Sequence, residues 1–128
     1  MARVSKIMLT DVPTLKKEAK IEDAAKLLVQ SQVGCVVIVE NENPVGIVTE
    51  LDVVRNLVSK GKNVVKEPVS KIMASPITYM DTDMKLDEAL KIIDTKRYRR
   101  YPVTENQKLV GLVTKRDIVN SMSDNIKF

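Results

Sequence analysis

A five-residue segment that occurs twice constrains the fold of this chain more than any other feature of its sequence. Residues 4–8 read Val-Ser-Lys-Ile-Met, and the same five residues return at 69–73, an offset of 65. The match continues from there to the end of the chain without a gap, and many of the aligned pairs exchange one apolar residue for another. A duplicated structural unit produces this pattern. The sequence therefore predicts two copies of one fold, over 1–64 and 65–128.

The length and composition of the chain suit two such copies that form one small module. With 128 residues in all, neither copy could bury enough apolar surface by itself. The chain is 44% hydrophobic and 30% charged, as is typical of globular proteins. No apolar run approaches the roughly 18 residues that span a bilayer, and the first residues do not resemble a signal peptide. We therefore expect a cytoplasmic protein that does not enter membranes.

The rarest residue types exclude several kinds of chemistry. Histidine is absent, which removes histidine-based zinc sites and Ser-His-Asp triads. The single cysteine, Cys35, lies in a β-branched run and is expected to be an inert buried thiol. There is no glycine-rich phosphate loop, and the net charge of +4 favours anionic ligands only mildly. We therefore expect no enzymatic activity, no metal and no cofactor.

Each copy is predicted to follow the order β-α-β-β-α. For the first copy the expected elements are a strand at 12–15, a helix from about 21, a strand at 35–39, a polar turn at 40–44, a strand at 45–49 and a helix at about 51–59. The first helix of each copy has apolar residues at helical spacing: Ile21, Ala24, Ala25 and Leu28, then Leu86, Ala89, Leu90 and Ile93. In the second copy a strand is expected at 77–80, and Ile118, Val119 and Met122 supply the buried face of the last helix. A polar segment at 60–68 links the copies.

The doubled unit closely resembles the CBS domain, named after cystathionine β-synthase. The resemblance is carried by Gly-Ile-Val-Thr-Glu-Leu-Asp at 46–52, by Gly-Leu-Val-Thr-Lys-Arg-Asp at 111–117 and by Arg-Tyr-Pro-Val at 100–103. The repeated lead-in pentapeptide before each unit also belongs to it. It covers essentially the whole chain, and two such stretches in register are strong evidence.

This resemblance implies an α+β fold in which two pseudo-twofold-related units pack sheet to sheet as a Bateman module. Similar pairs lie inside IMP dehydrogenase and the γ subunit of AMP-activated protein kinase. Family members typically bind AMP, ATP, related nucleotides or S-adenosylmethionine in the clefts between the units, and they often regulate an attached protein. We therefore expect a regulatory module that senses an adenosine-type nucleotide (AMP, ADP, ATP or S-adenosylmethionine), forms a homodimer and signals to an effector protein.

The Thr-x-x-Asp spacing at the start of the second helix of each copy has two interpretations. In the family this Asp holds ribose, which assigns Asp52 and Asp117 to the ligand, with Thr49 and Thr114 beside them. A carboxylate accepts hydrogen bonds and so suits a diol, which donates two. The same spacing is close to the capping box, in which both side chains satisfy free amides of the first helical turn. The two roles can coexist.

A basic segment with tyrosines precedes the second strand of the second copy. Arg99, together with Arg100, is expected to receive ligand phosphate, and the face of Tyr98 can support a base. The alternative is a solvated helix end that complements the helix dipole, with Tyr98 and Tyr101 as ordinary strand core. At the equivalent place the first copy is uncharged around Gly34, which we also include in the ligand site, so the two clefts should differ in charge. For Lys96 and Arg97 we prefer a solvated helix end that complements the helix dipole.

The first strands should line the base pocket, since family sites combine pieces from both copies. The candidates are Val12, Pro13, Ile77 and Thr78, although core packing explains their apolar character equally well. Pro13 removes an amide donor, which counts against a pocket there. Lys20 and Lys85 stand where the family commonly caps the first helix with Ser or Thr, a departure that affects stability more than binding.

Nucleic-acid binding through 96–100, with its interleaved tyrosines, is the alternative function. Only a few positive charges cluster there, and no helix-turn-helix, zinc finger or ribonucleoprotein motif accompanies them. Nucleic-acid binding should weaken steeply with salt, whereas a buried ribose contact should not.

Overall fold

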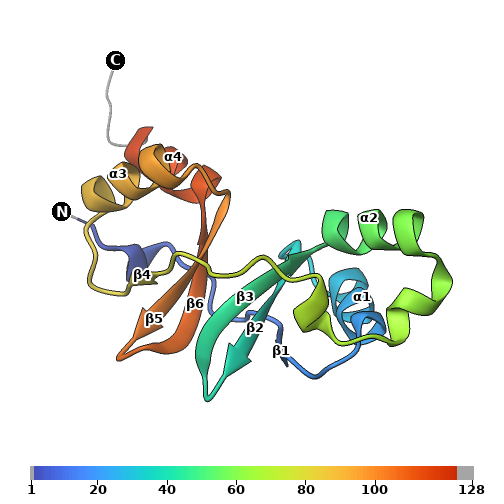
Figure 1. Cartoon of the computed structure of the whole chain (residues 1–128). Coiled ribbons are helices and arrows are strands. Elements are labelled where there is room, and N and C mark those ends of the chain that lie inside the picture. The colour runs from blue at the N-terminus through green and yellow to red at the C-terminus, as the bar shows by residue number, and fades with distance from the viewer. Residues whose placement is uncertain (1, 124–128) are drawn as a thin grey trace. The chain divides into compact units, whose positions relative to one another are not determined.

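A computed structural model describes residues 2–123, and within it the chain divides into two compact units. We call Val12–Ile77 the repeat-1 unit, and Met1–Asp11 together with Thr78–Phe128 the repeat-2 unit. These packing units have other bounds than the sequence repeats at 1–64 and 65–128, because each lead-in segment packs with the repeat that it does not precede. Figure 1 shows the elements of both units.

The repeat-1 unit is a three-stranded sheet with two helices. Its elements are β1 (Thr14–Lys16), α1 (Ile21–Gln30), β2 (Cys35–Glu40), β3 (Asn43–Thr49) and α2 (Glu50–Lys60), followed by the 3-10 turns η2 (Lys62–Lys66) and η3 (Val69–Lys71). The strand order is β1-β2-β3, with β1 parallel and β3 antiparallel to β2. This is the β-α-β-β-α order that the sequence predicts.

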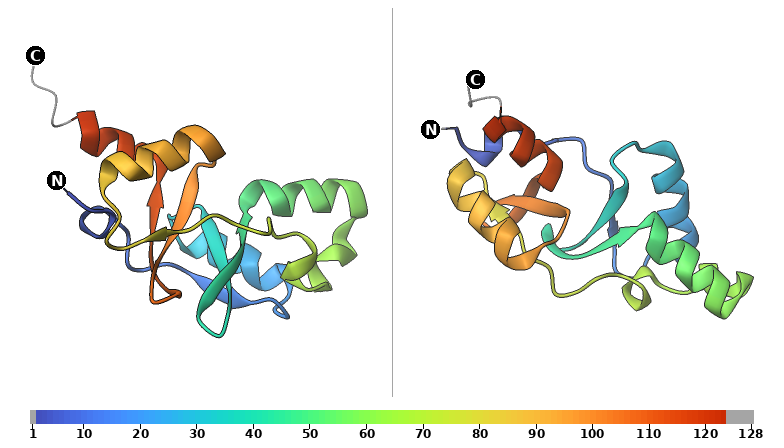
Figure 2. Two further views of the ribbon diagram at one scale, coloured as in Figure 1. Left: turned by 60° about the vertical axis from the view of Figure 1, so that its left-hand side comes forward. Right: turned by 90° about the horizontal axis from the view of Figure 1, so that it is seen from above.

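The repeat-2 unit has the same order and topology. It contains η1 (Val4–Lys6), β4 (Met80–Asp81), α3 (Leu86–Lys96), β5 (Arg100–Glu105), β6 (Lys108–Thr114) and α4 (Lys115–Ser123). The strand order is β4-β5-β6, again with one parallel and one antiparallel pair. Helices α3 and α4 lie side by side (Figure 2). The α+β class is therefore confirmed.

The first strand of each unit starts later than the sequence predicts. Strand β1 begins at Thr14 instead of Val12, and β4 at Met80 instead of Ile77. Pro13 has no amide to donate to a strand ladder, so it stays outside β1. Its carbonyl still accepts a hydrogen bond from the Val37 amide at 3.0 Å.

Two-residue turns close both hairpins. Asn41 and Glu42 have φ values of 52° and 67°, and Asn106 and Gln107 have 52° and 68°. Two successive positive φ values are the requirement of a type I′ turn, whose twist matches the flanking strands. Asn tolerates this left-handed region better than most residues, which explains why it opens the turn in both repeats.

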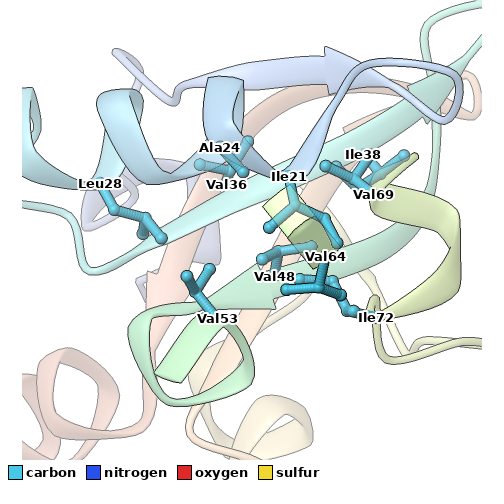
Figure 3. Packing of buried hydrophobic residues seen from close by; sticks show 10 residues of the cluster. All are labelled: Ile21, Ala24, Leu28, Val36, Ile38, Val48, Val53, Val64, Val69 and Ile72. Carbon is cyan, nitrogen blue, oxygen red and sulfur yellow. The ribbon is translucent and has the colours of Figure 1, made fainter. Parts of the chain in front are cut away.

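The predicted helix faces form the cores. Ile21, Ala24 and Leu28 are buried and point from α1 toward Val36 and Val48 of the sheet (Figure 3). In the repeat-2 unit the buried positions of α3 are Leu86, Ala89 and Ile93. Ala25 and Leu90 are only partly buried. Cys35 is fully buried, as expected for a core thiol.

The last helix differs from its prediction at one residue. Ile118 is fully buried and Met122 packs against the same core. Val119, however, is 43% exposed, so it was wrongly placed on the buried face. Within 2–123, no helix has the length and apolar character needed to span a membrane.

Candidate ligand-binding site

In the repeat-1 unit the Thr-x-x-Asp sequence forms a closed capping box. Thr49 is the N-cap of α2, and its hydroxyl accepts a hydrogen bond from the Asp52 amide at 3.4 Å. One carboxylate oxygen of Asp52, Oδ2, accepts from the Thr49 amide at 2.9 Å and from the Thr49 hydroxyl at 3.1 Å. The capping interpretation is therefore confirmed for this repeat, and this oxygen already has two donors.

In the repeat-2 unit only half of this arrangement forms. The Asp117 amide donates to the Thr114 hydroxyl at 3.1 Å, as in the other repeat. The Asp117 carboxylate, by contrast, accepts no hydrogen bond from any residue that the structure describes, and the residue is only partly buried. Its oxygens therefore remain available to hydroxyl donors of a ligand.

A pocket of about 700 Å³ opens beside this helix start in the repeat-2 unit. It is lined by Arg99, Arg100, Thr114, Lys115, Arg116, Val119 and Asn120. Two backbone features bring these residues together: Arg100 pairs with Thr114 across the β5–β6 ladder, and the Lys115 amide donates to the Arg99 carbonyl at 2.7 Å. The pocket therefore lies where β5 starts, β6 ends and α4 begins.

The pocket is strongly cationic. Four of its lining residues carry a positive charge, and none of those that line it is acidic. The first turn of α4 adds the positive end of the helix dipole, although its Lys115 and Asp117 amides already donate to the Arg99 carbonyl and the Thr114 hydroxyl. The Nε atom of Arg100 is buried and has no hydrogen-bond partner within the described part of the chain. This combination suits an anion with several oxygens, such as a phosphate group.

The equivalent place in the repeat-1 unit lacks this charge. At the offset of 65, the four cationic residues correspond to Gly34, Cys35, Glu50 and Leu51. Gly34 has φ 85°, a left-handed value that favours glycine, and it leads directly into β2. The structure brings Arg99 and Arg100 into one pocket with Thr114, and their role as receivers of ligand phosphate stays a prediction.

The sequence analysis missed Lys115 and Arg116. Both lie inside the stretch 111–117, which was interpreted only for its Thr and Asp. A signal was present, because the repeats match closely there yet Glu-Leu in one copy is replaced by Lys-Arg in the other. The exchange reverses the charge at one position, from Glu50 to Lys115, and adds a positive charge at the next, from Leu51 to Arg116, so it distinguishes the two helix starts.

The two tyrosines have different roles. Tyr101 is fully buried, and its hydroxyl accepts a hydrogen bond from the Tyr98 amide at 3.0 Å. Burial raises the pKa of Tyr101 above its usual value of 10.0, an effect that this hydrogen bond partly offsets. Tyr98 is 50% exposed and does not line the pocket. Its role in supporting a base stays a prediction.

Asp117 and the remaining candidates are not among the residues that line the pocket, so the ribose role of Asp117 stays a prediction. Thr78, in the repeat-2 unit, is half-buried and does not line it. Val12, Pro13 and Ile77 are half-buried residues of the repeat-1 unit. A ligand role for these four residues and for Gly34 stays a prediction.

The lysines and arginines at the ends of the first helices occupy capping positions. Lys96 is in the last turn of α3 and Arg97 is its C-cap, as the helix-end interpretation requires. Lys20 and Lys85 are the N-cap residues of α1 and α3. In α1 the cap is supplied by Asp23 instead, which accepts from the Lys20 amide at 3.0 Å.

Curated relatives match most of this chain. An uncharacterised protein of Methanopyrus kandleri is 40% identical over 88% of the chain, and one of Methanocaldococcus jannaschii is 31% identical over 95%. The chain spans 56% and 32% of the length of these two proteins. The CBS domain-containing protein YhcV of Bacillus subtilis is 30% identical over 97% of the chain, which covers 89% of its length.

Solved structures share the fold. A CBS-domain protein of Burkholderia ambifaria, described as a putative signal-transduction protein, is 27% identical with a TM-score of 0.81, over 99% of this chain and 98% of its own. The CBS domain pair of protein MJ0100, solved with 5′-methylthioadenosine and S-adenosyl-L-methionine, has 22% identity and a TM-score of 0.83, over 98% and 99%. CBSX2, solved with AMP, has 22% sequence identity and a TM-score of 0.77, and the match covers 97% of this chain and 98% of CBSX2.

The family model for the CBS domain matches the chain twice, at residues 4–59 and 69–124. The two matches fall on the two predicted copies and include both lead-in pentapeptides. The chain therefore belongs to the CBS domain family and carries two tandem copies of that domain.

Proposed function

We propose that this chain is a ligand-binding regulatory module that binds a phosphate-bearing adenine nucleotide through its repeat-2 unit. The observation that carries the proposal is the cationic pocket at the start of α4, which is lined by Arg99, Arg100, Lys115 and Arg116. The known ligands of the similar pairs, AMP in one and S-adenosylmethionine in another, support an adenosine-type compound.

The chemistry of the pocket assigns parts of such a ligand to residues. Arg99 and Arg100 supply forked guanidinium donors for phosphate oxygens, and Lys115 and Arg116 add charge at the helix start. Asp117 lies in the first turn of the same helix but is not among the residues that line the pocket, and we propose its carboxylate as the acceptor for the two ribose hydroxyls. S-Adenosylmethionine carries a positive sulfonium, so a pocket with four cations favours a phosphate-bearing nucleotide over it.

The same reasoning makes the repeat-1 unit the weaker site. Asp52 Oδ2 already accepts two hydrogen bonds from Thr49, so a ribose that uses both carboxylate oxygens would have to compete with the cap of α2. Glu50 at the helix start repels phosphate in addition. We therefore propose that one nucleotide is bound through the repeat-2 residues before any second one.

We further propose that the module forms a homodimer and regulates an effector protein. Support for self-association comes from α2, where Leu51 and Val54 are 53% and 52% exposed and Val58 is 83% exposed. These positions share one helical face, and exposed apolar faces of this kind are typical of interfaces. The proposed work is binding and regulation, with no reaction catalysed by the chain.

Calorimetry and thermal unfolding with AMP, ADP, ATP and S-adenosylmethionine test the nucleotide proposal. A ligand present at about 100 times its Kd stabilises the fold by about 2.7 kcal/mol, which raises the melting temperature measurably. Asp117→Asn should weaken nucleotide binding, and Asp52→Asn, the same change at the equivalent position, serves as the matched control. Lys115→Glu with Arg116→Leu, which installs the repeat-1 residues, should remove the preference for ATP over S-adenosylmethionine. The proposal fails if none of the four ligands shifts the melting temperature.

A further inference from the structure

The lead-in segments dock on the two units in the same way. The Val4 amide donates to the Met84 carbonyl at 2.8 Å, and the Val69 amide donates to the Ala19 carbonyl at 2.7 Å. The amides of the serines that follow make a second equivalent pair: Ser5 donates to Thr82 at 3.2 Å, and Ser70 donates to Lys17 at 3.3 Å. Each unit therefore recognises the same backbone segment through the same carbonyl positions.

The residue that follows each pentapeptide, Leu9 or Ala74, then pairs with the edge strand of a sheet. Strand β6 is at the edge of its sheet, and Leu9 exchanges two backbone hydrogen bonds with Leu112 of this strand, at 2.8 and 2.9 Å. Ala74 does the same with Ile47 at the edge of β3, at 2.9 and 3.2 Å. An uncovered edge strand is a template for pairing with another chain. Leu9 therefore covers part of the β6 edge, and Ala74 covers part of the β3 edge.

Side chains make the docking specific. Val4 and Val69 are fully buried in the cores of the units on which they dock. Met8 covers Gly111 so closely that a Cβ on this glycine would lie 2.7 Å from the Met8 sulfur and 2.7 Å from the Leu9 carbonyl oxygen. What we call the docking groove consists of three features: the buried site that Val4 fills, Gly111, and the edge of β6 at Leu112.

The segment that joins residues 2–9 to the repeat-1 unit has few restraints. Thr10 and Asp11 are exposed and belong to no helix or strand, and β1 begins only at Thr14. We call Thr10 and Asp11 the hinge. If the hinge opens, residues 2–9 can leave their own groove and bind the identical groove of a second copy of the chain. The contacts of an exchanged pair would equal those of the closed chain, so protein concentration and the hinge decide between the two forms.

We propose that the docking groove of the repeat-2 unit takes residues 2–9 from a second copy of this chain, so that two chains exchange these arms. The occupant follows from the structure itself, because this pentapeptide fills the equivalent groove in both units. The proposal does not depend on nucleotide binding or on self-association through α2.

Disulfide trapping between separate chains tests the exchange. Leu9 and Leu112 form a hydrogen-bonded antiparallel pair, whose Cα atoms lie about 5.5 Å apart, within the range that a disulfide bridges. Chains with Leu9→Cys are mixed with chains with Leu112→Cys over a range of concentrations, oxidised, and analysed by mass spectrometry without reduction. We expect a mixed disulfide between positions 9 and 112 whose yield rises with concentration.

Three controls make the result decisive. The double variant, with both cysteines in one chain, should form the disulfide within the chain, which verifies the Leu9–Leu112 pairing. In the second control, chains with Val29→Cys replace those with Leu9→Cys. Val29 is 87% exposed, so this mixture measures how much disulfide forms by random collision of the chains. Adding Gly111→Val to the Leu112→Cys chain fills the groove and should reduce the mixed disulfide to that amount.

Two outcomes would overturn the proposal. In the first, the double variant closes within the chain while the mixture yields no more than the collision control at any concentration. In the second, the double variant does not form the disulfide, so the pairing on which the exchange rests is absent. Circular dichroism of each variant shows that the fold is retained in the samples compared.

Discussion

The carboxylate of Asp52 accepts a hydrogen bond from the Thr49 amide at 2.9 Å, while Asp117, its counterpart 65 residues later, uses only its amide in the equivalent turn. One sequence motif therefore does two jobs in one chain. In the repeat-1 unit it closes a helix cap with both side chains, and in the repeat-2 unit the Asp117 carboxylate takes no part in the cap.

Replacing the two aspartates should affect stability unequally. Asp52→Ala removes two hydrogen bonds to Thr49 and should lower the free energy of unfolding by about 1 kcal/mol, the usual cost of losing a helix cap. Asp117→Ala removes no such bond and should cost less than half as much. Urea unfolding of both variants measures the difference, and equal losses would contradict the assignment of distinct roles.

Adding one methyl group at Gly111 should destabilise the repeat-2 unit. In Gly111→Ala the new Cβ meets the Leu9 carbonyl at 2.7 Å, and a backbone atom cannot swing aside as a side chain can. We expect a loss of about 1–3 kcal/mol, the range for overpacking. Gly46→Ala is the matched variant: its closest contact is the mobile Met73 side chain, and the nearest backbone oxygen is 3.2 Å away, so its loss should be smaller. Thermal unfolding that ranks Gly46→Ala as the more harmful change would refute this.

Alkaline unfolding should involve Tyr101. Its pKa is raised by burial, so the folded state holds the phenol proton more tightly than the unfolded state does. This contribution to stability is fully present below pH 10 and is lost as the pH rises through the pKa of the folded state. Tyr101→Phe should cost about 1 kcal/mol at neutral pH, because the Tyr98 amide loses its acceptor. It should also make the free energy of unfolding fall less steeply above pH 10. Parallel slopes for the two proteins would contradict the prediction.

Two positions on α1 should respond very differently to truncation. Ile21 is fully buried against the sheet, and Ile21→Ala should lower the free energy of unfolding by about 2–5 kcal/mol through lost burial and a cavity. Val29, on the same helix, is 87% exposed, and Val29→Ala should change it by no more than about 0.5 kcal/mol. Chemical denaturation of the two variants provides the comparison, and a large effect at Val29 would mean that this face is covered in solution.

Much of each unit could be predicted because the information is local. The spacing of Ile21, Ala24 and Leu28 defines the buried face of α1, and the β-branched run from Cys35 specifies a strand covered on both sides. A polar turn was expected at 40–44, but the structure closes this hairpin with Asn41 and Glu42 alone and begins β3 at Asn43, so the turn is shorter than predicted. Helix periodicity gave the wrong side for Val119, because a pattern of apolar residues does not show which of them a neighbouring element covers.

By itself, the sequence determined the duplication, the order β-α-β-β-α in each copy, most of the core and the membership of the CBS domain family, since periodicity and motif spacing are properties of the chain alone. Only the tertiary structure decided that Val4 is buried in one unit and Val69 in the other, so that each lead-in segment serves the repeat it does not precede. It also decided that Lys115 and Arg116 join Arg99 and Arg100 around one pocket. The physical reason is that both features depend on contacts between residues far apart in the chain, and local patterns carry no record of which distant segment fills a groove or faces a cavity.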